Sequence, residues 1–133
     1  MTYLLDVNAL VALGFHQHEF HGRVVSWVSQ ANPPAFLATC SITELGFARV
    51  LAQVPSYGFT VEQARNLLLR LKKLESSRFT FVTDSHDLSH LPNWVNAGKQ
   101  VTDGHLMQLA KANGAVLASL DERIPGAFLI PHV

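Results

Sequence analysis

The stretch "YLLDVNAL", residues 3–10, places a carboxylate at the point where an apolar segment ends. Residues 2–6 are typical of a short buried strand, and Asn8 to about Phe15 carries apolar residues at helical spacing. Asp6 therefore lies at the junction of a predicted strand and a predicted helix. Ligands of open parallel sheets bind beyond the carboxyl ends of the strands, so this junction is a candidate binding site.

The rest of the chain alternates predicted strands with predicted helices. Proline in "NPP", 32–34, ends one helix, Thr60 is suited to cap another, and Gly114 is a natural stop for the last. The segments 55–60 and 84–94 are predicted to be loops, the second with at most one helical turn. We expect strands at 35–39, 79–82, 115–120 and 127–131, and helices at 18–30, 42–53, 61–75 and 102–113. This alternation predicts an α/β sandwich with a mostly parallel sheet.

Length and composition predict one globular domain over residues 1–133. Apolar residues make up 48% of the chain and charged residues 15%, which is typical of a folded protein. No apolar run approaches the roughly 20 residues of a membrane span, and no basic region of a signal peptide opens the chain. Cys40 is the single cysteine, so we expect a buried thiol, no intrachain disulfide and a cytoplasmic protein without membrane partners.

Three further acidic residues occupy positions that resemble that of Asp6. Asp121 lies just past the predicted strand 115–120, while Glu44 and Asp103 each lie in the first turn of a predicted helix. Because parallel strands end at one edge of a sheet, the four carboxylates are able to gather there.

Each acid also has a purely structural interpretation. Asp6 is suited to cap the helix that follows it, and Ser41-Ile42-Thr43-Glu44 matches a capping box. Asp103 can face the positive end of a helix dipole, and Asp121 in "LDERIPG" is typical of a turn. Taken singly, none of the four indicates a functional site.

Taken together, the four acids create an electrostatic problem. Two like charges about 4 Å apart repel by roughly 4 kcal/mol at an effective dielectric constant of 20. Either some of the carboxylates hold protons or a cation is present. Ligands that offer only oxygen suit hard cations such as Mg²⁺ or Mn²⁺, and such a metal supplies an activated water and stabilises charge on a phosphate.

Three stretches carry a resemblance to a known family: "LLDVNALVAL", "SITELGFARV" and "VTDGHLMQLAKANGAVLASLDERI". In order, spacing and total length the chain resembles the PIN-domain ribonucleases, especially the VapC-type toxins of type II toxin–antitoxin systems. The resemblance implies a PIN-like three-layer α/β/α sandwich. It also implies that an acidic quartet binds one or two Mg²⁺ or Mn²⁺ ions; the quartet is Asp6, Glu44, Asp103 and Asp121.

The resemblance further implies that Asn8 and Thr102 are polar supporting residues at the edge of the site. Ser119 occupies a position where the family often has Thr. The implied activity is metal-dependent endoribonuclease cleavage of RNA phosphodiester bonds, with Asp103 as a candidate proton acceptor. Implied partners are the RNA substrate, a cognate antitoxin protein and a second copy in a homodimer. With the quartet neutralised by metal, the remaining six acids and ten bases leave a mildly basic protein.

Two other functions remain open at this point. One is a PIN-like RNA- or protein-binding module without catalytic turnover, which differs from the nuclease in lacking metal-dependent cleavage. The other is a phosphatase with an aspartyl nucleophile, but that chemistry needs a second Asp two residues after Asp6, where this chain has Asn8. The sequence contains no phosphate-binding glycine loop, which argues against nucleotide binding.

Several residues outside the quartet are weaker candidates. Arg49 lies five residues after Glu44 and is a candidate substrate contact, as is His105, which with Gly104 replaces the apolar or small pair expected after Asp103. A solvated loop is the main interpretation of His16, His18 and His21, with an RNA or partner contact, or a metal site, as the alternatives. The basic stretch Arg65, Arg70, Lys72, Lys73 and Arg78 is interpreted as a wet helix face or a phosphate track, and Tyr57 and Trp94 as packing or base-stacking residues.

Overall fold

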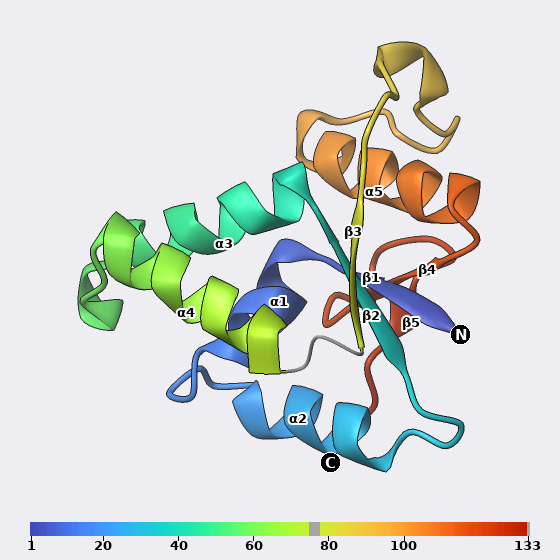
Figure 1. Cartoon of the computed structure of the whole chain (residues 1–133). Helices are drawn as coiled ribbons and strands as arrows, with labels where there is room; N and C mark the ends of the chain where they lie inside the picture. The colour runs from blue at the N-terminus through green and yellow to red at the C-terminus, as the bar shows by residue number, and fades with distance from the viewer. Residues whose placement is uncertain (75–77, 133) are drawn as a thin grey trace.

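The sheet is five-stranded and wholly parallel in its pairing (Figure 1). The computed structural model describes residues 1–74 and 78–132. Its strands are β1 (Thr2–Leu5), β2 (Phe36–Cys40), β3 (Phe79–Val82), β4 (Val116–Ser119) and β5 (Phe128–Leu129), in the order β3-β2-β1-β4-β5. The mostly parallel α/β sandwich predicted from the sequence is confirmed. The chain winds outward from β1 to β3 and then returns to β4 on the other side of β1, so the topological switch point lies between β1 and β4.

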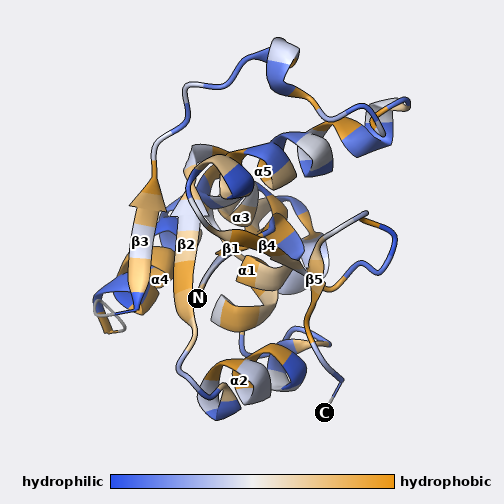
Figure 2. Cartoon of the chain, turned by 90° about the vertical axis from the view of Figure 1, so that its right-hand side faces the viewer, coloured by the Kyte–Doolittle hydropathy of each residue, from blue (hydrophilic) through white to orange (hydrophobic). Residues whose placement is uncertain are grey.

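Helices cover both faces of this sheet, as Figure 2 shows with α5 above it and α1 and α2 below it. Their bounds are α1 (Val7–Gly14), α2 (His21–Gln30), α3 (Ser41–Gln53), α4 (Val61–Leu74) and α5 (Val101–Ala112). Each predicted helix is found. None of the helices within the described residues combines the length and the apolar character that a bilayer crossing demands.

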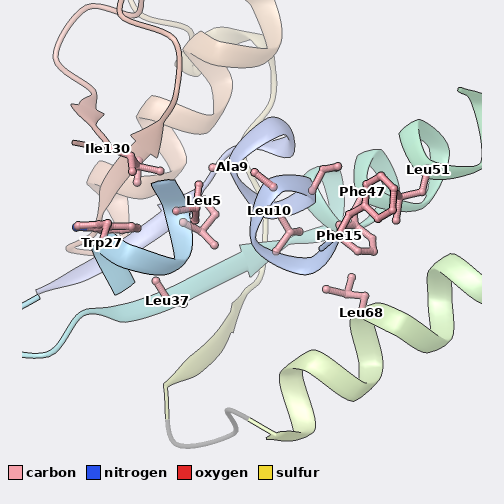
Figure 3. Close-up of a cluster of buried hydrophobic side chains, with 14 of the residues drawn as sticks. Leu5, Ala9, Leu10, Phe15, Trp27, Leu37, Phe47, Leu51, Leu68 and Ile130 are labelled. Carbon is pink, nitrogen blue, oxygen red and sulfur yellow. The ribbon is translucent and has the colours of Figure 1, made fainter. Parts of the chain in front are cut away.

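The alternation of side chains along the strands assigns residues to two cores. Leu4 and Leu117 face α5 and pack with Leu106 and Leu109. The next residue of each strand points to the other face, where the larger core includes Leu5 and residues of α1 to α4. Figure 3 shows this core, with Leu10, Phe15, Phe47 and Leu68 meeting between the helices. Strands buried on both faces explain why the strand segments are continuously apolar.

The boundaries of some elements differ from the predicted ones. The helix expected at 18–30 begins at His21, because the preceding residues form turns in which His18 N donates to Phe15 O and His21 N to His18 O. The last strand is only Phe128–Leu129, and β4 ends at Ser119. The predicted end of the fourth helix at residue 75 lies outside the described residues. Thr60 caps α4 as expected, since its Oγ1 accepts from Gln63 N at 3.1 Å.

The loops contain short 3₁₀ turns. Pro55–Tyr57 forms one where a plain loop was predicted, and Leu88–His90 forms the single turn expected within 84–94. A further turn, Gly98–Gln100, leads directly into α5. Cys40 is fully buried at the end of β2, as predicted.

Candidate active site

Asp6 lies directly after β1 and has both carboxylate oxygens engaged. Its Oδ1 accepts from Ala9 N at 2.8 Å, which confirms the interpretation of Asp6 as the cap of α1. Its Oδ2 accepts a hydrogen bond from Ser119 Oγ. The residue is only 6% exposed. The pKa of Asp6 is raised from 3.8 to about 6, mainly by burial and to a smaller extent by the negative charges of Asp103 and Asp121, against the lowering effect of these hydrogen bonds.

Ser119 joins the ends of the two strands at the switch point. It is fully buried at the last position of β4. Its hydroxyl donates to Asp6 and accepts from Asp121 N at 2.9 Å. The hydroxyl therefore fixes the distance between the acid that follows β1 and the acid that follows β4.

Asp103 and Asp121 complete a group of three interacting carboxylates. Asp103 is the third residue of α5 and is partly buried. Burial and the negative charge of Asp121 raise the pKa of Asp103. Asp121 itself follows β4 in a turn, because its Oδ1 accepts from Arg123 N at 2.9 Å, which confirms the turn interpretation. We refer to Asp6, Asp103 and Asp121 as the acidic triad.

Arg123 is a residue of this site that sequence reasoning missed. Its Nε lies 2.9 Å from Asp121 Oδ1, and its Nη2 lies 3.1 Å from Oδ2. This two-point hydrogen bond lowers the pKa of Asp121, and the positive charge also opposes the rise in the pKa of Asp103. The signal in the sequence was the spacing of two residues in "LDERI", where a turn folds the side chains together.

Glu44 has partners of its own. Its Oε2 accepts from Thr39 Oγ1 at 2.6 Å and lies 2.5 Å from Lys72 Nζ. The capping-box interpretation of Glu44 is wrong, because α3 begins one residue earlier than predicted. Cys40 is the cap residue, and Thr43 Oγ1 accepts from Cys40 N at 2.9 Å. Thus three of the four predicted acids influence one another's charge, while Glu44 is held by a lysine from α4.

The remaining predicted site residues lie on helices α1, α3 and α5. Asn8 is exposed in the first turn of α1 and lines a pocket together with Asp121. Thr102 is exposed in the first turn of α5, and Arg49 is exposed on α3. His105 forms a hydrogen bond through Nε2 with Asp84, in the loop after β3.

Gly104 is explained by packing. A Cβ atom there would collide with the Val95 side chain. The loop before α5 therefore packs directly on the backbone beside Asp103, and any larger residue at 104 would force Val95 to shift. His105, the next residue, faces the same loop through its bond to Asp84.

The carboxylate oxygens are the type of ligand that a hard divalent cation prefers. They are not arranged around a common point as a complete metal site would require. Within residues 1–74 and 78–132, no three His, Cys, Asp or Glu side chains are arranged to hold one metal ion. Mg²⁺ needs fewer protein ligands, since it usually keeps several waters and binds one or two carboxylates. Asp6 is buried beside two further acids, and its pKa is raised. A cation bound there would stabilise the ionised form of Asp6. Asp121 would have to release Arg123 to contribute both of its oxygens.

Comparison with known proteins agrees with this geometry. The family model "PIN domain" matches residues 3–127. The protein named Ribonuclease VapC38 from Mycobacterium tuberculosis is 39% identical over 121 residues, covering 89% of this chain and 84% of that protein. Ribonuclease VapC44 from the same organism is 34% identical over 138 residues, covering 96% of this chain and 94% of that protein.

A solved structure supports the fold. The crystal structure of VapBC2 from Rickettsia felis, bound to a DNA fragment from its promoter, superposes with a TM-score of 0.56 and covers 97% of both chains at 16% identity. At that identity the likeness concerns architecture alone. The sequence matches carry the assignment further, and the chain belongs to the PIN domain family and, within it, to the VapC group.

Proposed function

We propose that this protein is a metal-dependent endoribonuclease that hydrolyses RNA phosphodiester bonds as the toxin of a toxin–antitoxin pair. The observation that carries the proposal is the acidic triad, in which a buried carboxylate is kept beside two others at the switch point of the sheet. Structural needs alone do not account for three neighbouring acids, because their mutual repulsion costs stability. Relatives named as ribonucleases support a nuclease activity for this chain.

Each residue of the site has a separate proposed role. Asp6, Asp103 and Asp121 would hold Mg²⁺ or Mn²⁺, with Glu44 joining them if Lys72 moves away. The bound ion would supply an activated water and charge stabilisation at the phosphate. Ser119 keeps Asp6 oriented, and Asp103, with its raised pKa, is suited to accept a proton from the attacking water. Arg123 is paired with Asp121, and its positive charge would become available to a phosphate oxygen only after Asp121 released it.

The same proposal includes the biological setting. A cognate antitoxin would block the site, consistent with the name of the VapBC2 complex from R. felis. We also propose a homodimer acting in the cytoplasm, a single domain over residues 1–133, and Asn8 and Thr102 as polar supports of the site.

A second candidate function is a binding module without turnover. It is favoured by the open arrangement of the carboxylates, since the described residues offer no three-ligand metal shell. This candidate predicts RNA or protein binding that needs no divalent metal.

The deciding experiment is cleavage of total RNA by protein purified free of any partner, in Mg²⁺, in Mn²⁺ and in EDTA. Wild-type protein is compared with Asp103→Asn, whose fold is checked by circular dichroism. Discrete fragments from wild type alone, lost in EDTA, are the expected result. Equal cleavage by Asp103→Asn would remove the triad from the mechanism, and metal-independent binding without cleavage would favour the binding module.

A further inference from the structure

A pocket of about 510 Å³ adjoins the acidic triad. It lies between the connection from α1 to α2 and the turn after β4. We call it the side pocket; its lining residues are Asn8, His18, Glu19, Phe20, Leu120, Asp121, Glu122 and Arg123. Because Asp121 belongs to both the triad and the pocket, a strand of RNA whose phosphate lies at the triad would place a neighbouring nucleotide at this pocket.

Phe20 gives the pocket a fixed aromatic ring. Phe20 is 37% exposed, and the Arg23 guanidinium carbon lies 5.8 Å from the centroid of its ring. Arg23 is itself buried and donates from Nε to Ile130 O at 3.0 Å. A cation anchored to the last part of the chain therefore supports the ring, while part of its surface remains free. Such rings are the platforms on which single-stranded bases stack.

His18 is fixed in a single tautomer beside this ring. Its Nδ1 accepts a hydrogen bond from Phe20 N at 3.0 Å, and burial lowers the pKa of His18. In the neutral ring the proton is then on Nε2, which is a hydrogen-bond donor. The connection between α1 and α2 thus contributes both an aromatic surface and an oriented N–H group.

The charge of the side pocket selects which part of a nucleotide enters it. Glu19, Asp121 and Glu122 line the pocket with carboxylates, and the Arg123 guanidinium is already bonded to Asp121. This excess of negative charge repels a phosphate. It favours a base whose edge carries amino hydrogens, because a carboxylate accepts hydrogen bonds from them.

We propose that the side pocket receives the nucleobase of a nucleotide next to the scissile phosphate, with Phe20 as the stacking platform and Glu19 as the group that favours an amino-bearing base over uracil. This inference rests on the proposed RNA substrate. It adds a position at which the enzyme reads its target. Phe20, Glu19 and His18 are then binding residues that specify sequence rather than participants in the chemistry.

The test compares two short single-stranded RNAs, oligo-C and oligo-U. Cytosine has an amino group at C4 and an acceptor at N3, whereas uracil has a carbonyl group at C4 and a single N–H donor at N3. Binding of fluorescein-labelled RNA is measured by anisotropy, once in EDTA and once in Ca²⁺. The proteins are wild type, Phe20→Ala, Glu19→Gln and the control Phe36→Ala. Phe36 is 48% exposed and begins β2, at the end of the sheet opposite the triad. Cleavage of total RNA in Mg²⁺ is measured in parallel for the same four proteins.

Wild type and Phe36→Ala are expected to bind oligo-C severalfold more tightly than oligo-U. Phe20→Ala should weaken both by about tenfold, as expected for loss of one stacked base, and Glu19→Gln should reduce the preference for oligo-C. Three results would each show that the side pocket is not a base site. They are equal binding of the two RNAs by wild type, unchanged binding by Phe20→Ala, and no binding in either buffer. If the binding pattern holds but wild type cleaves no RNA, only the nuclease proposal fails.

Discussion

Lys72 Nζ lies 2.5 Å from Glu44 Oε2 and joins α4 to the first part of α3. The same ammonium group lies 5.4 Å from the centroid of the Phe81 ring, on β3. Thr39 donates a second hydrogen bond to the same carboxylate oxygen. The charge of Glu44 is therefore balanced by the protein's own lysine, whereas in the described part of the chain no lysine or arginine forms an ion pair with Asp6 or Asp103.

We expect Lys72→Met to tighten Mg²⁺ binding by about fivefold if Glu44 is a metal ligand. The reason is that removal of one neighbouring positive charge is worth about 1 kcal/mol even at high dielectric. Isothermal titration calorimetry on the RNA-free protein measures this directly. Lys73→Met is the control, since Lys73 is exposed on the same helix. Equal affinities in the two variants would exclude Glu44 from the metal site.

Asp6→Asn should stabilise the metal-free protein at pH 7. The folded state raises the pKa of Asp6 from 3.8 to about 6, so ionised Asp6 costs about 3 kcal/mol of folding free energy. The contribution of Asp6 to the free energy of unfolding is at its full value below pH 3.8 and decreases as the pH rises to about 6. The reason is that, over this range, the folded state binds the proton more tightly than the unfolded state does. Asn can still cap α1 and pair with Ser119, so the gain should approach this cost.

The measurement is urea unfolding of wild type and Asp6→Asn between pH 4 and pH 8 in EDTA. The two curves of unfolding free energy against pH should separate between pH 4 and pH 6 and then run parallel. Added Mg²⁺ should raise the stability of wild type more than that of the variant. A variant less stable than wild type at pH 7 would mean that the cap and the Ser119 bond outweigh the charge.

Arg123→Ala should also tighten Mg²⁺ binding in the absence of RNA. The guanidinium holds both oxygens of Asp121, at 2.9 and 3.1 Å, and so competes with a metal for the same lone pairs. We expect an effect of about fivefold by calorimetry, with Arg65→Ala, an exposed residue of α4, as the control. Weaker metal binding by Arg123→Ala would show that the turn needs this pair to hold Asp121 in position.

Gly46→Ala should destabilise the junction between α1 and α3. A Cβ atom at Gly46 would lie 2.5 Å from Val7 Cγ2 and 3.1 Å from Val7 Cγ1, and such overpacking costs about 1–3 kcal/mol. Because Val7 follows Asp6, the change should also displace the acid. Gly22→Ala is the matched control: its Cβ would meet nothing within 4 Å, so a gain of about 0.4–1 kcal/mol is expected. Urea unfolding of both variants checks the contrast, and equal stabilities would contradict it.

The order of strands and helices could be predicted from the sequence because the signals are local. Apolar runs such as "AVLASL" and helical spacing such as that of Val61 to Leu74 need no knowledge of distant residues. The boundaries of helices were less predictable where turns compete with the helix for backbone hydrogen bonds. The second helix begins at His21 rather than at residue 18, because the backbone N–H groups of His18 and His21 already donate hydrogen bonds within the preceding turns.

The sequence alone determined which acids follow strands or open helices, and its resemblance to PIN-domain ribonucleases named the four acids as a group. Tertiary structure decided which of them interact. Ser119 donates a hydrogen bond to Asp6, which lies 113 residues away in the chain, and accepts one from Asp121. Glu44 is instead paired with Lys72, 28 residues away. Those partners come from elements that meet only after the sheet and helices have packed. Charge pairing depends on distances in space, and spacing along the chain does not encode these directly.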